Sequence, residues 1–375
     1  MRIGLNAHLL SRQAGYRSAG IHGYIYNLLA NLASVAPEDW HFTAFVGRGN
    51  PHTFDRATLR QSPFVTGSPL QRILWEQGWQ PWALRHFDLY HSLAFVSPLI
   101  LLAPSVVTVY DLSFIHYPQA LNPGRRLYLR RFTGLSCRRA RRVIAISHST
   151  ARDIHQTFGI PLERIDVAAC GYDATRYQKL PVANVAAFRQ QKGLPERFWL
   201  FVGTLERRKN LTTLLDAYAQ LPRAERLPLI LAGGKGWLYA DIFERVERYG
   251  LAGDVFFPGF IAAEELPLWY NCAETFIYPS VFEGFGLPVL EAMACGTPVI
   301  VSDASSLPEV AGDAGMRIPP QDVSAWVEAL KKAFYDAGWR EQAAQQGFIE
   351  AKRYSWRKTA EQTIISYKRA LGMDG

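Results

Sequence analysis

The segment Pro279–Gly312 reads PSVFEGFGLPVLEAMACGTPVIVSDASSLPEVAG and places two carboxylates, Glu283 and Glu291, around a Gly-Phe-Gly turn. A helix is predicted to begin directly after this turn, at Pro288. The first turn of a helix exposes unpaired backbone N–H groups and about half a positive charge, which suits a phosphate. A ligand with both phosphates and hydroxyls, such as a sugar nucleotide, would bind the N–H groups and the two acids together.

Strand and helix patterns alternate outward from this segment, which predicts parallel sheets covered by helices. Strands are expected in the first half near Ile3–His8, Phe42–Val46, Leu89–Ser92, Val106–Tyr110, Val143–Ile146 and Asp166–Ala169, with helices at Ile21–Leu32 and Arg125–Arg142. A second series has strands near Trp199–Gly203, Leu227–Ala232, Val255–Pro258, Thr275–Tyr278 and Pro298–Val301, and helices at Leu211–Leu221, Asp241–Tyr249 and Pro288–Ala294. The polar stretch Tyr172–Pro195 is predicted to be a linker, and Val323–Leu371 to be helical.

The expected fold class is therefore α/β, with two doubly wound, Rossmann-like domains. A chain of 375 residues, 49% hydrophobic and 20% charged, suits two globular domains. We expect one domain in residues 1–178, a second in 179–354 and a C-terminal helix in 355–375. Two such units would place a cleft between their strand ends, where ligands of open α/β sheets bind.

The chain is basic, with a net charge of +8, which favours polyanionic partners. Much of the excess lies in one short stretch, at Arg125, Arg126, Arg130, Arg131, Arg138, Arg139, Arg141 and Arg142. This stretch is either a solvated helix face or a patch that contacts an anionic membrane surface or a lipid phosphate. No nucleic-acid partner is expected, because no nucleic-acid-binding motif accompanies the arginines.

Several features predict a cytoplasmic protein, peripheral at most on the inner face of the cell membrane. The four cysteines show no paired spacing, so neither a disulfide framework nor a zinc site is expected. Met1–Leu10 is interpreted as a strand rather than a signal peptide. Leu89–Tyr110 lacks charged residues, but Pro98 and Pro104 interrupt it, and we interpret it as two buried strands.

The segment FVGTLERRKN supplies cations that suit the phosphates of a ligand such as a sugar nucleotide. It leaves a strand at Gly203. Its Arg208 and Lys209 precede Asn210, which is expected to cap the following helix. No Asp-x-Asp motif occurs in the chain, so no metal and no other cofactor is expected.

Together these motifs resemble the family 4 retaining glycosyltransferases. The Glu-x7-Glu spacing of Glu283 and Glu291 matches that family's signature, and LERRKN is similar to its GxxxPRKN element, with Arg207 in place of the proline. The resemblance implies a GT-B fold, with two facing Rossmann-like domains and a final helix that crosses back onto the N-terminal domain. Ser355–Ala370 matches that helix.

The resemblance also implies the donor site. Glu291, expected in the first helical turn and kept ionised there by the helix dipole, would hold the ribose hydroxyls. Glu283 would face the donor sugar, and Arg208 and Lys209 the diphosphate. Backbone groups of the remaining donor-binding residues would contact sugar, phosphate and base; these residues are Gly20, Gly203, Thr204, Gly259, Phe260, Phe285, Gly286 and Leu287.

The N-terminal half resembles the acceptor side of the family. SAGIHGYIYNLL is similar to its glycine loop, with a helix that starts at Ile21. Tyr110 stands where the family has a histidine beside the donor sugar, Asp111 is retained, and both are assigned catalytic roles. The acceptor-side candidates are Ile21, His22, Gly23, Tyr24, Trp75 of RILWEQ, and His116.

These features together predict a retaining, metal-independent hexosyltransferase with a front-face mechanism. The first choice of donor is GDP-mannose, with UDP-glucose or another UDP-sugar as the alternative, and the acceptor is a saccharide or a lipid-linked saccharide. A UDP-sugar epimerase and a non-catalytic sugar-nucleotide-binding subunit stay open as further alternatives.

Overall fold

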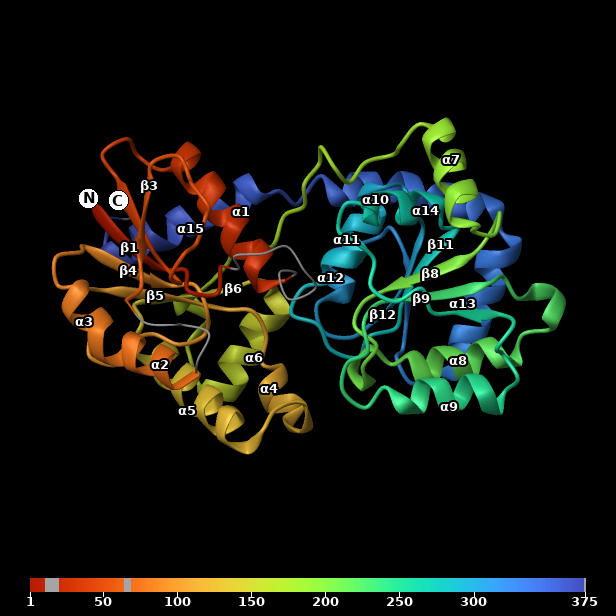
Figure 1. Cartoon of the computed structure of the whole chain (residues 1–375), viewed down its shortest axis with the longest axis horizontal. Helices are drawn as coiled ribbons and strands as arrows, with labels where there is room; N and C mark the ends of the chain where they lie inside the picture. Colours follow the sequence, from red (N-terminus) through yellow and green to blue (C-terminus); the bar gives the residue numbers. More distant parts are fainter. Residues whose placement is uncertain (11–19, 64–68, 374–375) are drawn as a thin grey trace. The chain divides into compact units, whose positions relative to one another are not determined.

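The computed structural model describes residues 1–10, 20–63 and 69–373 and divides the chain into two compact units. Unit 1 comprises Met1–Gly171 together with Trp356–Gly375, and unit 2 comprises Tyr172–Ser355 (Figure 1). The division at Gly171 lies ahead of the boundary expected at residue 178. The cleft expected between the domains stays a prediction.

The sheet of unit 1 has seven parallel strands within the described residues, in the order β3-β2-β1-β4-β5-β6-β7. Its strands are β1 (Arg2–Asn6), β2 (His41–Val46), β3 (Ala57–Gln61), β4 (Leu89–Ser92), β5 (Ser105–Val109), β6 (Arg142–Ala145) and β7 (Ile165–Val167). All the predicted strands are confirmed, with shifts of a few residues. Sequence reasoning missed β3, because this edge strand is largely exposed and polar.

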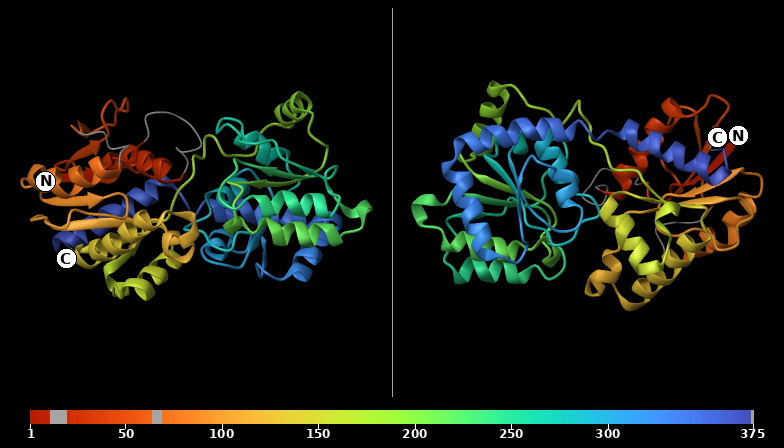
Figure 2. Two further views of the ribbon diagram at one scale, coloured as in Figure 1. Left: turned by 60° about the horizontal axis from the view of Figure 1, so that its bottom comes forward. Right: turned by 180° about the vertical axis from the view of Figure 1, so that it is seen from behind.

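Helices cover both faces of this sheet (Figure 1). They are α1 (Ile21–Val35), α2 (Pro69–Leu74), the π-helix η2 (Trp75–Trp79), α3 (Gln80–Ala83), α4 (Ser113–His116), η3 (Pro118–Ala120), α5 (Pro123–Arg139), α6 (His148–Phe158), η4 (Leu162–Arg164) and α15 (Trp356–Leu371). The final helix α15 packs beside α1 in unit 1, as the resemblance implied (Figure 2).

The sheet of unit 2 has six parallel strands in the part of the chain that the structure describes, in the order β10-β9-β8-β11-β12-β13. Its strands are β8 (Trp199–Val202), β9 (Leu229–Ala232), β10 (Val255–Phe256), β11 (Thr275–Tyr278), β12 (Val299–Ser302) and β13 (Met316–Ile318). The short, half-exposed β13 was not predicted.

The helices of unit 2 also lie on both faces of its sheet (Figure 1). They are α7 (Val182–Lys192), η5 (Arg207–Lys209), α8 (Leu211–Gln220), η6 (Arg223–Glu225), α9 (Ala240–Arg248), α10 (Leu266–Cys272), α11 (Leu287–Ala294), α12 (Leu307–Ala311), α13 (Val323–Tyr335) and α14 (Ala337–Ala351). The irregular linker predicted for 172–195 is wrong in part, since α7 occupies its centre.

Burial explains why the apolar stretch 89–110 forms strands. Every residue of β4 and β5 is buried, and Ser97 and Leu99 in the loop between them are fixed by hydrogen bonds to other parts of unit 1. Within the described residues, none of the helices combines the length and the apolar character that crossing a bilayer requires.

An ion-pair cluster joins α15 to the edge of the sheet in unit 1. Asp166 on β7 accepts hydrogen bonds from Arg142, at 2.5 and 2.8 Å, and from Arg369 on α15, at 2.5 Å. Burial alone would raise the pKa of Asp166, but the two arginines lower it below its ordinary value of 3.8. The final helix is therefore held by a charge-assisted contact as well as by packing.

We predict that Asp166→Asn lowers the free energy of unfolding of unit 1 by about 2 kcal/mol at pH 7, because two arginines lose their shared carboxylate. Since the pKa of Asp166 is depressed by folding, this stabilisation is present above about pH 4 and is lost as the pH falls. Urea unfolding at pH 7 and pH 3 measures both effects. Asp313→Asn, at an exposed ion pair, is the control, and equal losses in the two variants would contradict the prediction.

Candidate active site

Two loops of unit 2 lie side by side because their strands are neighbours. Strand β8 pairs with β11 in parallel, so both strands end at the same edge of the sheet. The segment 203–210 follows β8, and the segment 279–286 follows β11. The carboxyl edge of an open α/β sheet is where such folds bind ligands. The sheet therefore brings together the two motifs that the sequence analysis selected.

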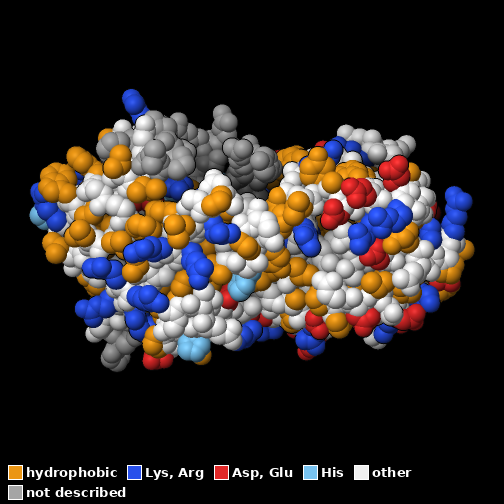
Figure 3. Space-filling view, turned by 90° about the horizontal axis from the view of Figure 1, so that it is seen from below, with side chains coloured by type: hydrophobic (Ala, Val, Ile, Leu, Met, Phe, Trp, Pro, Cys, Tyr) orange, Lys and Arg blue, Asp and Glu red, His pale blue; other side chains and the backbone are white. Residues whose placement is uncertain are grey.

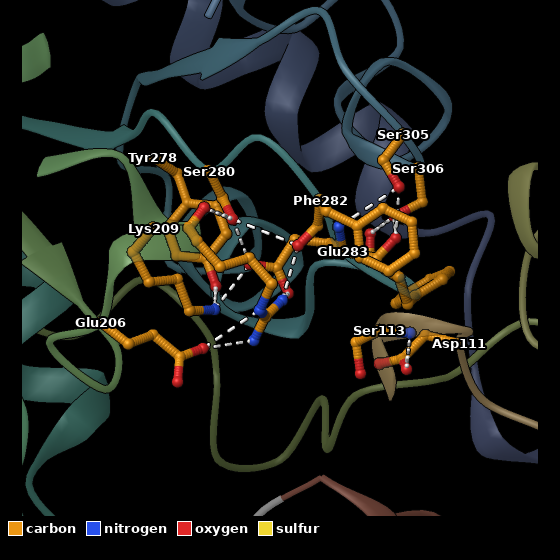
Figure 4. Close-up of polar contacts among 12 residues, drawn as sticks. Asp111, Ser113, Glu206, Lys209, Tyr278, Ser280, Phe282, Glu283, Ser305 and Ser306 are labelled. Carbon is orange, nitrogen blue, oxygen red and sulfur yellow. Dashed lines mark hydrogen bonds and ion pairs between the residues drawn. The ribbon is translucent and has the colours of Figure 1, made fainter. Parts of the chain in front are cut away.

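Glu283 is the centre of the resulting cluster (Figure 4). Its Oε1 accepts hydrogen bonds from Lys209 Nζ at 2.6 Å and from Ser280 Oγ at 2.6 Å. Its Oε2 accepts from the Arg208 guanidinium at 2.9 Å. One carboxylate thus orients both cations that were predicted to face a diphosphate.

Each cation has further partners. Lys209 donates to the hydroxyl of Tyr278 at 2.7 Å, at the end of β11. Arg208 donates to the carbonyl oxygen of Phe282 at 2.5 Å and to Glu206 at 2.7 Å. Glu206 was not selected from the sequence, although it lies two residues before Arg208. The cluster therefore contains two cations and two carboxylates rather than two free cations.

Burial and the neighbouring charges shift the pKa values of both Glu283 and Lys209. Burial alone would raise the pKa of Glu283, but Arg208 and Lys209 lower it to about 2. Burial lowers the pKa of Lys209, against the opposing effect of Glu283. Glu283 is 9% exposed and Lys209 6% exposed, so each depends on the other for compensation of its charge.

The turn after Glu283 is fixed by two serines on the loop that follows β12. Ser305 Oγ accepts from the Glu283 N–H at 3.2 Å and donates to the carbonyl oxygen of the same residue at 2.5 Å. Ser306 Oγ donates to the carbonyl oxygen of Phe285 at 2.6 Å. Gly286 has a φ of 117°, and a Cβ there would lie 2.8 Å from Leu307. The turn therefore requires glycine at this position.

This turn presents unpaired amides at the start of α11. Among residues 1–10, 20–63 and 69–373, the backbone N–H groups of Phe285, Gly286 and Leu287 donate no hydrogen bond to a protein acceptor. Unpaired N–H groups at a helix start are the usual donors to anions. The arrangement fits the role that the sequence predicted for these three residues.

The prediction for the ionisation of Glu291 is wrong. Glu291 lies beyond the first turn of α11, since the helix begins at Leu287, and the dipole there is weak. Burial raises the pKa of Glu291 to about 7, although the Tyr270 hydroxyl, which donates to Glu291 at 3.0 Å, acts in the opposite direction. Glu291 is therefore a carboxyl group that gains or loses its proton near neutral pH.

Close backbone approach explains the glycines of this edge. Gly203 has a φ of 159° at the end of β8, and a Cβ on Gly233 would lie 1.9 Å from the Gly203 carbonyl oxygen. The N–H of Gly233 donates to the carbonyl oxygen of Gly259 at 2.8 Å. Thr204 and Phe260 are exposed, with Phe260 at 55%. The loops after β8, β9 and β10 therefore lie in contact, and their roles toward a donor stay predictions.

Three aromatic residues assigned to the site belong to the core of unit 1. Tyr110 is 5% exposed and donates its hydroxyl to the Leu93 carbonyl oxygen at 2.5 Å, so it is not available as a catalytic donor. Tyr24, 1% exposed, packs edge-on against Tyr110 and Trp356. Trp75, also 1% exposed, packs against Phe45. The structure corrects these three assignments to packing roles.

The other unit 1 candidates lie on loops and helix ends. Gly20, with a φ of 72°, precedes Ile21 at the start of α1, and His22 and Gly23 lie in its first turn. Asp111 accepts from the Ser113 N–H at 2.9 Å at the start of α4. His116 pairs with Asp153 at 2.9 Å on the surface. Their proposed contacts with donor or acceptor stay predictions.

Sequence reasoning missed a buried polar cluster at the end of β1. Glu76 Oε1 lies 3.2 Å from His8 Nδ1 and 3.4 Å from Asn6 Nδ2. Burial raises the pKa of Glu76 to about 7 and lowers that of His8 to about 3. The nearby Tyr128 hydroxyl acts in the opposite direction on the pKa of Glu76. The only sequence signal is that Glu76 follows Trp75 in the motif already selected.

The arginine stretch is only partly a surface patch. Arg142 is committed to Asp166, which corrects its assignment to a membrane-facing set. The remaining members are exposed; these are Arg125, Arg126, Arg130, Arg131, Arg138, Arg139 and Arg141. The predicted helix Arg125–Arg142 is observed as α5, which starts at Pro123 and ends at Arg139.

Two further observations concern thiols and metal ligands. Cys137, Cys170, Cys272 and Cys295 are all buried and unpaired with one another. In the described part of the chain, no three or more His, Cys, Asp or Glu side chains lie close enough together to hold a metal ion.

Comparisons with known proteins agree with this fold and with the family resemblance. A family model described as "Glycosyltransferase Family 4" matches residues 19–176, and one described as "Glycosyl transferases group 1" matches residues 184–350. The chain is 36% identical to O-antigen chain mannosyltransferase B of Escherichia coli over 83% of its own length and 82% of that protein. It is 32% identical to the serotype-specific mannosyltransferase WbdA of E. coli, over 62% of its length and 29% of that protein.

A solved structure shows the same fold. The sucrose-phosphate synthase of Thermosynechococcus elongatus superimposes with a TM-score of 0.75, at 24% identity and full coverage of both chains. The two parallel sheets and this structural match show the GT-B fold, and the relatives named as mannosyltransferases show that the chain is a hexosyltransferase. More specifically, the chain belongs to glycosyltransferase family 4.

We predict that Glu283→Gln lowers the free energy of unfolding of unit 2 by about 3 kcal/mol at pH 7, because Lys209 stays buried opposite a neutral amide. The folded pKa of Glu283, about 2, is below its ordinary value of 4.5. The stabilisation that Glu283 provides is therefore complete above pH 4.5 and disappears as the pH falls toward 2. Denaturant unfolding between pH 3 and pH 8 tests this, with the exposed Glu328→Gln as control. A pH-independent difference would contradict the assignment.

For Glu291 we predict the opposite pH dependence. Its folded pKa of about 7 exceeds the ordinary 4.5, so the folded protein retains a proton that the unfolded chain releases between these values. The stability of the wild type should therefore fall as the pH rises through this window, whereas Glu291→Gln should lack this component. The measurement is the difference in unfolding free energy between the two proteins at pH 5 and pH 8. Parallel profiles would show that Glu291 is ionised throughout.

Proposed function

We propose that this protein transfers a mannosyl group from GDP-mannose to a saccharide or lipid-linked saccharide acceptor, with retention of configuration and without a metal ion. The sugar is suggested by the names of the relatives, O-antigen chain mannosyltransferase B and WbdA. The observation that carries the proposal is the convergence of Arg208 and Lys209 on Glu283, beside the unpaired amides at the start of α11.

The cluster suits a departing nucleoside diphosphate. When the bond between the anomeric carbon and the phosphate oxygen breaks, negative charge develops on the diphosphate. The N–H groups of Phe285, Gly286 and Leu287 would donate to it, and Arg208 and Lys209 would supply positive charge. Because Glu206 and Glu283 already compensate these cations, the site is close to neutral before the donor binds.

The main role of Glu283 would be to position the side chains of Arg208 and Lys209. Both of its oxygens are occupied by the cations and by Ser280, yet a carboxylate has about four lone-pair positions. It therefore retains capacity for a hydroxyl of the donor sugar. With its pKa near 2, it stays ionised at all physiological pH values and keeps the ammonium of Lys209 in one place.

The reaction would proceed on one face of the sugar. The acceptor hydroxyl attacks the anomeric carbon as the diphosphate leaves, and a phosphate oxygen takes the hydroxyl proton. The new C–O bond forms on the face from which the old one breaks, so configuration is retained. The protein contributes orientation and charge stabilisation, which suits a cluster of fixed ions better than a mobile acid–base pair.

The base of the donor is the least constrained part of the proposal. The predicted base contacts, at Gly259 and Phe260, come from backbone, which does not by itself select guanine over uracil. A UDP-sugar donor, UDP-glucose included, is therefore the second candidate. Glu291, held by Tyr270, would accept hydrogen bonds from the ribose in either case.

An acceptor carried on a lipid would place the enzyme at a membrane, and we propose the cytoplasmic face of the cell membrane. The exposed arginines of α5, with Arg125, Arg126, Arg130 and Arg131 among them, would contribute attraction to anionic lipid. Such attraction is worth about 1 kcal/mol for each arginine near the surface and is weakened by salt.

We predict that Lys209→Ala reduces transfer from GDP-mannose by about a hundredfold or more, as removal of one charge-stabilising donor does in other enzymes. The assay measures release of GDP with a mannose-containing acceptor, and nucleotide binding is measured in parallel by thermal shift with GDP, UDP and ADP. GDP is expected to raise the melting temperature of the wild type most.

Arg207→Ala is the matched control, because Arg207 is an exposed neighbour in the same motif. It should retain most of the activity. Stabilisation by UDP but not by GDP would replace GDP-mannose with a UDP-sugar. An inert wild type, with normal nucleotide binding, would favour the non-catalytic binding subunit, and conversion of the sugar without any acceptor would favour an epimerase.

A further inference from the structure

Six large apolar side chains are exposed in one region of unit 1, with exposed fractions between 42% and 90%. They come from the helical run α2–η2–α3, from the loop between β4 and β5, and from α5. We call them the apolar face; they are Leu74, Trp79, Trp82, Ile100, Leu102 and Leu127. Single exposed apolar residues are ordinary on a protein surface, but several on segments that are joined to one another indicate a binding surface.

Hydrogen bonds and packing join these three segments. Gln77 of η2 donates to the Ser97 carbonyl oxygen at 3.3 Å and accepts from the Leu99 N–H at 3.0 Å. The N–H of Ser97 donates to Ser136 on α5 at 2.9 Å. Leu101 packs into the small core that Trp75 also enters. The loop that carries Ile100 and Leu102 is therefore fixed between the other two segments.

The tryptophans are placed as interfacial residues usually are. The rings of Trp79 and Trp82 lie 5.3 Å apart, and the Arg85 guanidinium lies 4.3 Å above the Trp82 ring. Tryptophan and arginine both combine an apolar body with a polar end, so they prefer the boundary between hydrocarbon and water.

The exposed charge within the segments that carry the apolar face has one sign. In the segments 69–85, 97–104 and 123–142, Glu76 is the one carboxylate, and it is 2% exposed. The same segments contain many arginines; those exposed on α5 include Arg125, Arg126, Arg130 and Arg131. In the view of Figure 3, basic side chains (Lys or Arg) and hydrophobic side chains intermix over the part of the surface that unit 1 forms.

We propose that the apolar face inserts into the interfacial region of an anionic lipid bilayer while the neighbouring arginines bind its headgroups. This inference extends the proposed placement of the enzyme at a membrane and rests on it. A protein partner would have to match arginines that share these segments with the apolar side chains, with no exposed carboxylate in the same segments. A bilayer that contains anionic lipid supplies both the negative charge and the hydrocarbon without any such match.

The test measures co-sedimentation of the full-length protein with vesicles of phosphatidylcholine alone and of phosphatidylcholine with phosphatidylglycerol. We expect preferential binding to the anionic vesicles, weakened but not abolished by salt, because insertion is not screened. Leu102→Glu and Trp82→Ser should each reduce the partition coefficient by about tenfold. Leu102 is 90% exposed, so its substitution leaves folding intact.

The control is the double variant Tyr335→Ser and Ile349→Ser, which removes equally exposed apolar side chains from unit 2. It should bind like the wild type. Arg130→Ala with Arg131→Ala should weaken the preference for anionic vesicles. Quenching of tryptophan fluorescence by brominated acyl chains should occur in the wild type and decrease in Trp79→Phe with Trp82→Phe.

Three results would overturn the proposal. One is vesicle binding that the apolar substitutions leave unchanged, which would reduce the contact to charge alone. Another is absence of binding to anionic vesicles. The third is a dimer, detected by sedimentation equilibrium, that Leu102→Glu dissociates, which would make the face an interface between copies. Vesicle binding needs neither donor nor acceptor, so its failure is distinguishable from a failure of the proposed transfer reaction.

Discussion

The contact of Glu283 with Lys209 and Arg208 is the constraint on which the site depends. Three charged groups are removed from water within one small volume, and this is tolerable only because each compensates another. The arrangement requires β8 and β11 to be neighbours, the glycine turn at Gly286 and the two serines that hold it. The strand order, the glycine turn and the ion pairs therefore depend on one another. As a result, the amides at the start of α11 are held in a fixed position.

Much of the fold was predictable because buried strands are apolar and regularly spaced. The strands that escaped prediction, β3 and β13, are short or exposed and therefore lack that pattern. Helix α7 escaped because its residues are largely exposed, with Phe188 as its one buried side chain, so it has no apolar stripe. The crossing of α15 onto unit 1 was expected from the family resemblance and not from periodicity.

The site was predictable where function requires particular residue types at particular spacings. Arg208, Lys209 and Glu283 were selected in this way, and the structure joins them directly. Glu206, Ser305 and Ser306 were not, because a carboxylate near an arginine and serines after a strand are common. Tyr110, Tyr24 and Trp75 were wrongly assigned because large aromatic residues within a motif serve the core more often than the ligand. The pKa of Glu291 followed from burial, which no spacing reveals.

Unit 1 is built from both ends of the chain, since α15 packs on it after the whole of unit 2 has intervened. On the ribosome, residues 172–355 are complete before the last helix emerges, so unit 2 has all its own elements earlier than unit 1. Until α15 is synthesised, the surface of the unit 1 sheet that α15 covers stays exposed to solvent. The fold of unit 1 is therefore closed in a late step in which Arg369 reaches Asp166, and a chain truncated before α15 leaves unit 1 incomplete.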